Sequence, residues 1–370
     1  MVFKRFLNLL LVVVSCLLSF KVWAQTDEIM IWGPEFTFSN NEIGDLYEEN
    51  HHWSKTRKSK YNSALAFAQN QLLDLIQKKC TECQIEAVLK TNGIFGNQYR
   101  VIYSDGYWID ISLDLGVIET QAKPATREQY EMLAQRFQND IFDSAKEIGL
   151  FPDTFMSGGH IHVGFEYFKN QPILLRNFLV DFANHFELAE GILDLNTKNA
   201  PSLRAEGEDK IEKLKVLIAE FDRGELIFNK KKVTTAYQLA EAYFHLIQKK
   251  NRYYGLNLAR YHAGDYATIE IRSIRTQANF DEYLQELKLF ESRIKYLKEL
   301  SDKGMLIAVE NYVDESSKGI GQKKFKKLLV QKFHNYVVES GLEWGSYKKL
   351  IYMSELRRKK IIPMCRQLFN

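Results

Sequence analysis

The chain has 370 residues, of which 45% are hydrophobic and 26% are charged, and its formal net charge at pH 7 is +3. This length allows about two domains, or one large domain with insertions, in an ordered globular protein. The basic excess lies in the first residues, because subtracting Lys4, Arg5 and Lys21 from 50 basic side chains leaves 47 against 47 acidic ones. This balance gives no general attraction to nucleic acid or to an acidic membrane, so neither is expected as a partner.

Residues 1–24 have the pattern of a secretory signal peptide. The basic pair Lys4-Arg5 precedes the apolar run Phe6–Phe20, and Val22-Trp23-Ala24 has the form of a cleavage site. The apolar run is short for a membrane anchor, and Lys21 interrupts its end. We therefore expect an exported protein, periplasmic or secreted, with no stable membrane insertion after the signal peptide is cleaved.

The first half of the remaining chain alternates between strand and helix patterns. Gly33 to Phe38 predicts a strand, Asn40 to Lys60 a loop rich in charge and aromatics, and Ser63 to Lys78 a helix with one apolar face. Turns are expected at Asn92-Gly93 and Asp105-Gly106. The strands expected around these turns are Ile85 to Leu89, Tyr99 to Tyr103, Trp108 to Leu113, and a segment from Leu113 to Gln121 that carries Glu119.

The second half is mainly helical. Thr126-Arg127-Glu128-Gln129 has the form of a capping box, and it opens a helix that ends near Gly149. Residues 174–250 and those from Phe280 onward also have helical spacing. We predict an α+β fold in which helices cover an antiparallel sheet. The expected organisation is a sheet domain at 25–277 with a helical insertion at about 174–250, followed by a helical C-terminal region at 278–370.

Three cysteines follow the leader: Cys80, Cys83 and Cys365. Export favours oxidation, so Cys80-Thr81-Glu82-Cys83 could form a local disulfide, a redox pair or half of a zinc site. No second cysteine pair or histidine lies close by in the sequence. A structural disulfide or two free thiols are therefore favoured over redox catalysis or zinc binding.

The most informative segment is Ser157-Gly158-Gly159-His160-Ile161-His162-Val163-Gly164. In an extended strand, residues two apart face the same side, so His160 and His162 project together. The strand patterns around Glu35 and Glu270 also place an ionisable residue on one face. Each pattern alone is compatible with a surface strand, but their joint occurrence suggests a metal and phosphate site.

The order of these motifs resembles that of the carboxylate–amine ligases of the glutamine synthetase fold. The resemblance is closest to the amidoligases and more distant to glutamate–cysteine ligase. It spans about Ile29 to Gln277, except for the helical stretch at 174–250. The motifs that carry it are Gly33-Pro34-Glu35-Phe36-Thr37, Asp105-Gly106 with Val117-Ile118-Glu119, Gly159-His160-Ile161-His162-Val163, Arg252-Tyr253 to Asn257, and Thr268-Ile269-Glu270-Ile271-Arg272.

The resemblance implies a curved antiparallel sheet that holds two or more Mg²⁺ ions between ATP phosphates and protein carboxylates. It implies ATP-dependent amide or peptide bond formation from small-molecule or peptide carboxylate and amine substrates. Magnesium prefers oxygen ligands and keeps phosphates in its shell. The implied ligands are Glu35, His160 and Glu270 for one ion, and Asp105 and Glu119 for another. The implied catalytic residues are Arg272 and His162, which would also bind the nucleotide together with Arg252 and Asn257.

Two features keep other functions open. The first strand of the family usually carries two glutamates two residues apart, whereas the second position here is Thr37. Export also sends the chain to a compartment where ATP is scarce. One alternative is a catalytically degenerate binding protein on the same fold. Another is a metal-dependent hydrolase, since two histidines with acidic residues suit zinc, although the chain has no HExxH motif.

Overall fold

The computed structural model describes ten stretches of the chain. The described residues are 29–49, 55–88, 98–114, 116–152, 158–188, 200–249, 251, 253–264, 267–312 and 322–351. The predicted signal peptide, the predicted turn at Asn92-Gly93, Arg252 and Cys365 lie outside them. Residues from Ile31 onward belong to one compact unit, to which the following description refers.

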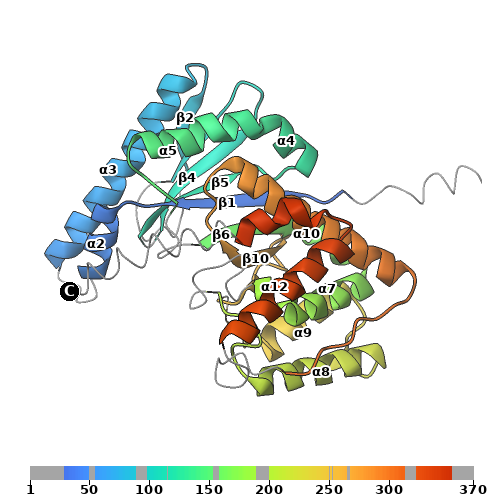
Figure 1. Ribbon diagram of the computed structural model, residues 1–370. Coiled ribbons are helices and arrows are strands. Elements are labelled where there is room, and N and C mark those ends of the chain that lie inside the picture. The colour runs from blue at the N-terminus through green and yellow to red at the C-terminus, as the bar shows by residue number, and fades with distance from the viewer. Residues whose placement is uncertain are drawn as a thin grey trace, which may run out of the picture. The chain divides into compact units, whose positions relative to one another are not determined.

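An eight-stranded antiparallel sheet forms the centre of this unit, with the strand order β2-β3-β4-β5-β1-β6-β10-β9 (Figure 1). The strands are β1 (Trp32–Phe38), β2 (Gln84–Val88), β3 (Gln98–Ile102), β4 (Trp108–Asp114), β5 (Val117–Ala122), β6 (Gly158–Gly164), β9 (Leu256–Asn257) and β10 (Thr268–Arg275). The first strand therefore lies inside the sheet, between β5 and β6. The α+β class predicted from the sequence is confirmed.

Helices make up most of the remaining described chain. They are α2 (Asn41–Glu49), α3 (Lys55–Lys79), α4 (Arg127–Arg136), the π-helical η2 (Phe137–Asp143), α5 (Ser144–Glu147), α6 (Glu166–Lys169), α7 (Pro172–Asn184), the 3₁₀-helical η3 (Phe186–Leu188), α8 (Glu208–Asp222), α9 (Ala236–Leu246), α10 (Phe280–Asp302) and α12 (Gln322–Glu339). A small hairpin of β7 (Ile227–Phe228) and β8 (Lys231–Lys232) lies between α8 and α9. In this part of the chain, no helix is long and apolar enough to span a membrane.

Local sequence signals account for several helix ends. The capping box at Thr126 is confirmed, since its side chain accepts a hydrogen bond from the backbone of Gln129, whose side chain bonds back. The loop predicted from Asn40 to Lys60 is wrong where α2 and the start of α3 replace it. The sequence does contain a start signal for α2. The Asn40 side chain accepts a hydrogen bond from the Ile43 N–H at 2.9 Å and caps this helix.

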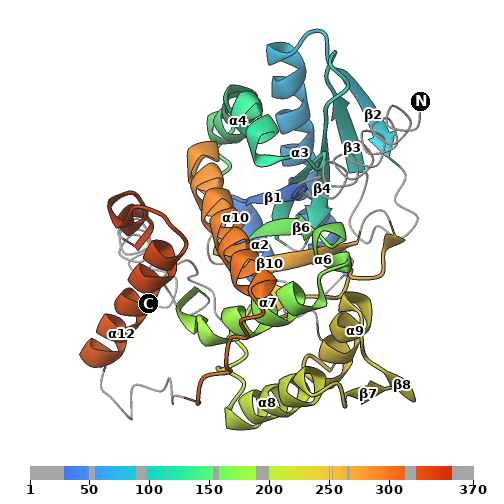
Figure 2. The same ribbon diagram turned by 90° about the vertical axis from the view of Figure 1, so that its right-hand side faces the viewer.

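One face of the sheet is apolar and packs against helices. Phe36 of β1 makes edge-to-face contacts with Phe137, Phe142, Phe280 and Tyr283, whose rings come from η2 and α10. In Figure 2, α10 crosses the central strands on this side. The predicted stripe on α10, Leu287, Phe290, Ile294 and Leu297, is fully buried. Burial of these aromatic rings fixes which face of β1 is inside.

The helices of the predicted insertion are joined to the C-terminal helices by packing and by buried charge. Helix α7 packs against both α9 and α10. Arg293 of α10 donates to Asp181 of α7, and its guanidinium also approaches the ring of His185 at 3.0 Å. His185 in turn contacts Glu187 at 2.7 Å between Nδ1 and Oε1. Burial alone would lower the pKa of His185, but Glu187 and Asp181 outweigh it and raise that pKa.

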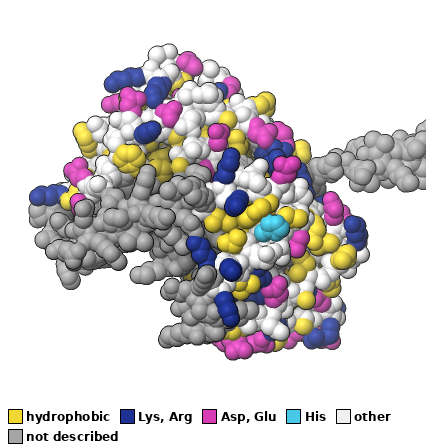
Figure 3. Space-filling view, viewed as in Figure 1, with side chains coloured by type: hydrophobic (Ala, Val, Ile, Leu, Met, Phe, Trp, Pro, Cys, Tyr) yellow, Lys and Arg dark blue, Asp and Glu magenta, His cyan; other side chains and the backbone are white. Residues whose placement is uncertain are grey.

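The Cys80-Thr81-Glu82-Cys83 motif forms a disulfide between Cys80 and Cys83 at the end of α3. Both cysteines are buried. The structural disulfide was one of the two favoured readings of this motif. On the face seen in Figure 3, acidic and basic side chains are interspersed over the described surface, as the balanced charge of the sequence suggests.

Candidate functional site

The other face of the sheet is lined with polar and charged side chains. In antiparallel pairing, directly opposed residues lie on the same face, so the register places side chains in rows across the strands. One row contains Arg100, Asp110, Gln121, Glu35 and His160, from β3, β4, β5, β1 and β6. Two shorter rows flank it. They are Ser112, Glu119 and Thr37 on one side, and Gly33, His162, Glu270 and Asn257 on the other.

Two buried glutamates converge on one histidine in these rows. Nδ1 of His160 lies 2.5 Å from Oε1 of Glu35 and 3.1 Å from Oε1 of Glu270. Glu35 is 7% exposed and Glu270 is 6% exposed. Neither contact has hydrogen-bond geometry at Nδ1, although the atoms are close. The imidazole nitrogen therefore lies close to two carboxylates without a well-formed hydrogen bond to either of them.

Each glutamate has further partners that fix its position. Nε2 of His162 lies 3.5 Å from Oε2 of Glu35. Glu270 accepts hydrogen bonds from Asn257 Nδ2 at 2.6 Å and from Arg272 Nη1 at 2.5 Å. A bulge in β10 after Ile271 interrupts the pairing with β6 next to Arg272. We call Glu35, His160, His162, Glu270, Arg272 and Asn257 the carboxylate–histidine cluster.

The cluster shifts the ionisation of its own members. Burial alone would raise the pKa of Glu35, but His160 and His162 hold it well below its ordinary value. Burial would also raise the pKa of Glu270, but His160, His162 and Arg272 lower it below its ordinary value. For His160, burial would lower the pKa, but Glu35 and Glu270 raise it. Both glutamates are therefore anionic, and they lie beside a histidine whose own pKa they raise.

The residues predicted as metal ligands fall into two groups. Glu35, His160 and Glu270 are brought together, as expected for one ion. Glu119 joins them indirectly, because Gln121 Nε2 donates both to Glu119 Oε1 at 2.5 Å and to Glu35 Oε2 at 3.2 Å. The shared amide makes Glu119 a neighbour of the carboxylate–histidine cluster.

Asp105 is not brought to Glu119. It lies in the exposed turn between β3 and β4, where Arg136 donates to its carboxylate at 2.7 Å. This hydrogen bond lowers the pKa of Asp105. Ser112, which opposes Glu119, is four residues beyond Trp108 along β4, a distance of roughly 13 Å at 3.3 Å per residue. The expectation that Asp105 and Glu119 share an ion is not supported by this placement.

The remaining predicted residues are also placed, except for Arg252, which lies outside the described residues. Arg272 and Asn257 contact the same glutamate, and Tyr253 lies beside the Arg272 guanidinium at 5.7 Å. Thr37 is 3% exposed, and its hydroxyl lies 3.0 Å from that of Thr276. Its position in the row with Glu119 agrees with the strand face inferred from the sequence.

Sequence reasoning missed Asp110 and assigned no role to Gln121. Asp110 accepts hydrogen bonds from Arg100 and Gln98 at 2.7 Å each, and it is 6% exposed. The same alternation that singled out Glu119 carries a signal for both residues. Asp110 and Ser112 are two apart on one strand, and Glu119 and Gln121 are two apart on the next.

The spacing of the Glu35, Glu270 and His160 side chains can be compared with the geometry that a divalent cation requires. Within the described ranges, no three His, Cys, Asp or Glu side chains already surround a point that would hold a metal ion. Nδ1 of His160 instead contacts one oxygen of Glu35 and one oxygen of Glu270 directly. Neighbouring ligands of an ion at about 2.1 Å are roughly 3 Å apart. The observed separations are close to this value, so these three side chains fit a divalent ion after a small outward movement.

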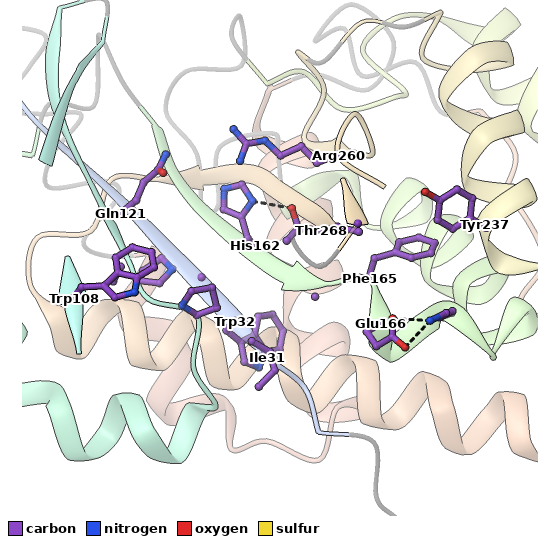
Figure 4. Close-up of a pocket in the computed structure, with 18 residues that line it drawn as sticks. Ile31, Trp32, Trp108, Gln121, His162, Phe165, Glu166, Tyr237, Arg260 and Thr268 are labelled. Carbon is purple, nitrogen blue, oxygen red and sulfur yellow. Dashed lines mark hydrogen bonds and ion pairs between the residues drawn. The ribbon is translucent and has the colours of Figure 1, made fainter. Parts of the chain in front are cut away.

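A pocket of about 700 Å³ lies beside the cluster (Figure 4). His162 and Gln121, which both contact Glu35, are part of its lining. The described residues of the predicted loop from Asn40 to Lys60 do not line this pocket, and the helical insertion contributes Tyr237. Comparison of the chain with protein-family models and with curated proteins finds no match.

Proposed function

We propose that the protein is an exported ATP- and Mg²⁺-dependent carboxylate–amine ligase with a curved sheet of the glutamine synthetase type. The observation that carries the proposal is the convergence of Glu35, His160 and Glu270 from three adjacent strands of an antiparallel sheet. Their order along the chain and their types match the resemblance seen in the sequence. The pocket beside them offers space for a substrate.

In this proposal Glu35, His160 and Glu270 hold one Mg²⁺. Bound Mg²⁺ would neutralise phosphate oxygens and orient them. The Gln121 amide lies between Glu35 and Glu119. A second ion would therefore have Glu119 as a ligand but not the other expected carboxylate, Asp105. Arg272 keeps a guanidinium beside Glu270, where it would bind phosphoryl oxygens, and Asn257 holds the other oxygen of that glutamate in place.

The reaction would proceed in two balanced steps. A substrate carboxylate oxygen attacks the γ-phosphorus of ATP, and ADP leaves, giving an acyl phosphate. The amine nitrogen then attacks the acyl carbon, the C–O bond to phosphate breaks, and inorganic phosphate and one proton leave. His162 contacts Glu35 and lines the pocket, so its side chain is placed to contact the reacting carboxylate.

The proposal is tested by mass analysis of products. Incubation with ATP, Mg²⁺ and mixed amino acids or peptidoglycan fragments should give a product lighter by one water than its two parts, together with ADP and phosphate. Calorimetric titration of Mg²⁺-ATP should show weaker binding for His160→Ala and for Glu270→Ala. The exposed Glu225→Gln variant, whose ion pair with Arg223 lies outside the pocket, provides the control. Unchanged affinity in both cluster variants would rule out a nucleotide site here.

A second candidate is a binding protein whose ligase site has degenerated. The observation that favours it is Thr37, which replaces the second carboxylate and is bonded to Thr276 inside the sheet face. A ligase should gain thermal stability from Mg²⁺ with an ATP analogue, because a ligand that binds the folded state stabilises it. A binding protein without the nucleotide site should show no such gain.

A further inference from the structure

The pocket next to the carboxylate–histidine cluster has an apolar side and a polar side. Its apolar wall includes Trp108, Phe165 and Tyr237, which come from β4, from the turn after β6 and from α9. Its polar wall includes His162, Gln121 and Arg260. A volume of about 700 Å³ is within the range of pockets that bury a small organic molecule.

Arg260 is the cation that distinguishes this pocket. Its side chain is exposed, and among the described residues it makes no ion pair. The other cation in the lining, Lys169, is paired with Glu166 at 2.9 Å, so these two charges offset each other. Among the described residues of the lining, Arg260 is therefore the cation without an acidic partner. In Figure 4 the guanidinium of Arg260 extends over the same part of the pocket as the ring of His162.

The aromatic wall is held in place by its neighbours. The guanidinium of Arg100 lies over the ring of Trp108 at 4.0 Å, and Arg100 is itself bound to the buried Asp110. Phe165 and Tyr237 meet edge to face at 5.7 Å between ring centres. Rings fixed in this way offer flat apolar surface at little entropic cost on binding. They suit a planar hydrocarbon group better than a flexible polar chain.

The polar wall leads directly to the proposed reaction centre. His162 lies 3.5 Å from Glu35, and Gln121 donates to the same glutamate oxygen at 3.2 Å. An anionic group bound by Arg260 and His162 would therefore stand next to the cluster. Within the described lining, one cation without an acidic partner matches a monoanionic carboxylate.

We infer that this pocket binds a small carboxylic acid with an aromatic body, with its carboxylate at Arg260 and its ring against the aromatic side chains of the apolar wall. Its assignment as the carboxylate substrate rests on the proposed ligase function, whereas the binding itself does not. The inference concerns the class of ligand, an aryl or arylalkyl carboxylate.

The inference is tested by calorimetric titration of the chain with 3-phenylpropionate and with its neutral amide, 3-phenylpropionamide. The acid should bind at least about tenfold more tightly than the amide, and Arg260→Met should remove that preference. Arg223→Met is the matched control, because Arg223 is an exposed arginine paired with Glu225 and lies outside this pocket. The control variant should bind the acid within about twofold of the native chain.

Equal affinity for acid and amide, or an unchanged preference in Arg260→Met, would overturn the inference. So would a finding that AMP binds, competes with the acid and is the ligand that loses affinity in Arg260→Met, since the pocket would then belong to the nucleotide. The two proposals fail separately. Binding of the acid without product from ATP, Mg²⁺ and an amine would leave the pocket assigned and refute the ligase, whereas ligase turnover without acid binding would refute the pocket alone.

Discussion

Glu270→Gln is the change that tests the charge balance of the carboxylate–histidine cluster most directly. Glu270 is 6% exposed and contacts Arg272 at 2.5 Å and His160 at 3.1 Å. A pair of unit charges about 3 Å apart attracts by roughly 5 kcal/mol at an effective dielectric constant of about 20, before desolvation is subtracted. Removing one partner of a buried ion pair costs about 3–5 kcal/mol, because the other charge stays buried and unpaired.

Glutamine keeps a carbonyl oxygen for Asn257, so we expect a loss near the lower end, about 3 kcal/mol in the free energy of unfolding. At roughly 2.1 cal/mol/K of unfolding entropy per residue, this corresponds to a fall of about 4 °C in the melting temperature of the compact unit that begins at Ile31. The assay is urea denaturation at pH 7 in EDTA, so that metal does not contribute. Glu166→Gln, which breaks an exposed ion pair, should change stability by less than about 1 kcal/mol. Equal stabilities of the native and Glu270→Gln chains would refute the cluster as described.

Three further predictions concern groups elsewhere in the fold. The pKa of His185 is raised in the folded state, so its contribution to stability should be complete below about pH 6.5, the ordinary pKa of histidine. This contribution should be lost as the pH rises through the folded-state pKa. In urea denaturation at several pH values, His185→Gln should show a weaker dependence of stability on pH. Replacing Cys80 and Cys83 by serine should lower the free energy of unfolding by about 2 kcal/mol, the entropy of a short loop, and should not affect the proposed ligase turnover. Thr37→Glu should lower stability in EDTA, because it loses the bond to Thr276 and buries one more carboxylate beside Glu119 and Glu35. Added Mg²⁺ should reduce this loss of stability.

Each of these predictions has a contrary outcome. An unchanged pH dependence in His185→Gln would mean that the imidazole gains nothing from Glu187 and Asp181. A folded cysteine variant that loses all turnover would give the disulfide a catalytic role. A stability deficit in Thr37→Glu that Mg²⁺ does not narrow would place residue 37 outside the metal's reach.

Much of the site could be predicted because side-chain alternation in a strand has a fixed period. The pattern around Glu35, His160 and Glu270 showed which residues share a face, and the pairing of β1, β6 and β10 then brought them together. The helical stripe on α10 was predictable for the same kind of reason, since its apolar spacing is local.

What could not be predicted depended on register and on turns. Alternation does not say which strand lies next to which, so the bridge from Gln121 to both Glu35 and Glu119 was invisible before pairing was known. Asp105 was grouped with Glu119 because the resemblance to the ligases implies that the two hold one ion. The turn at Gly106 instead directs Asp105 toward Arg136 on α4. The helix α2 was missed because residues 40–60 were assigned to a loop from their charged and aromatic composition, and Asn40 was not recognised as a helix cap.

The central position of β1 makes the site a late product of folding. β1 is synthesised first, yet one of its neighbours, β6, is made only after more than a hundred further residues, and β10 later still. Until β6 arrives, an edge of a strand that carries Phe36 and Phe38 stays unpaired, which is the condition for association between incomplete chains. A chain that ends before β10 lacks Glu270, so the carboxylate–histidine cluster is complete only after the last strand of the sheet has been synthesised.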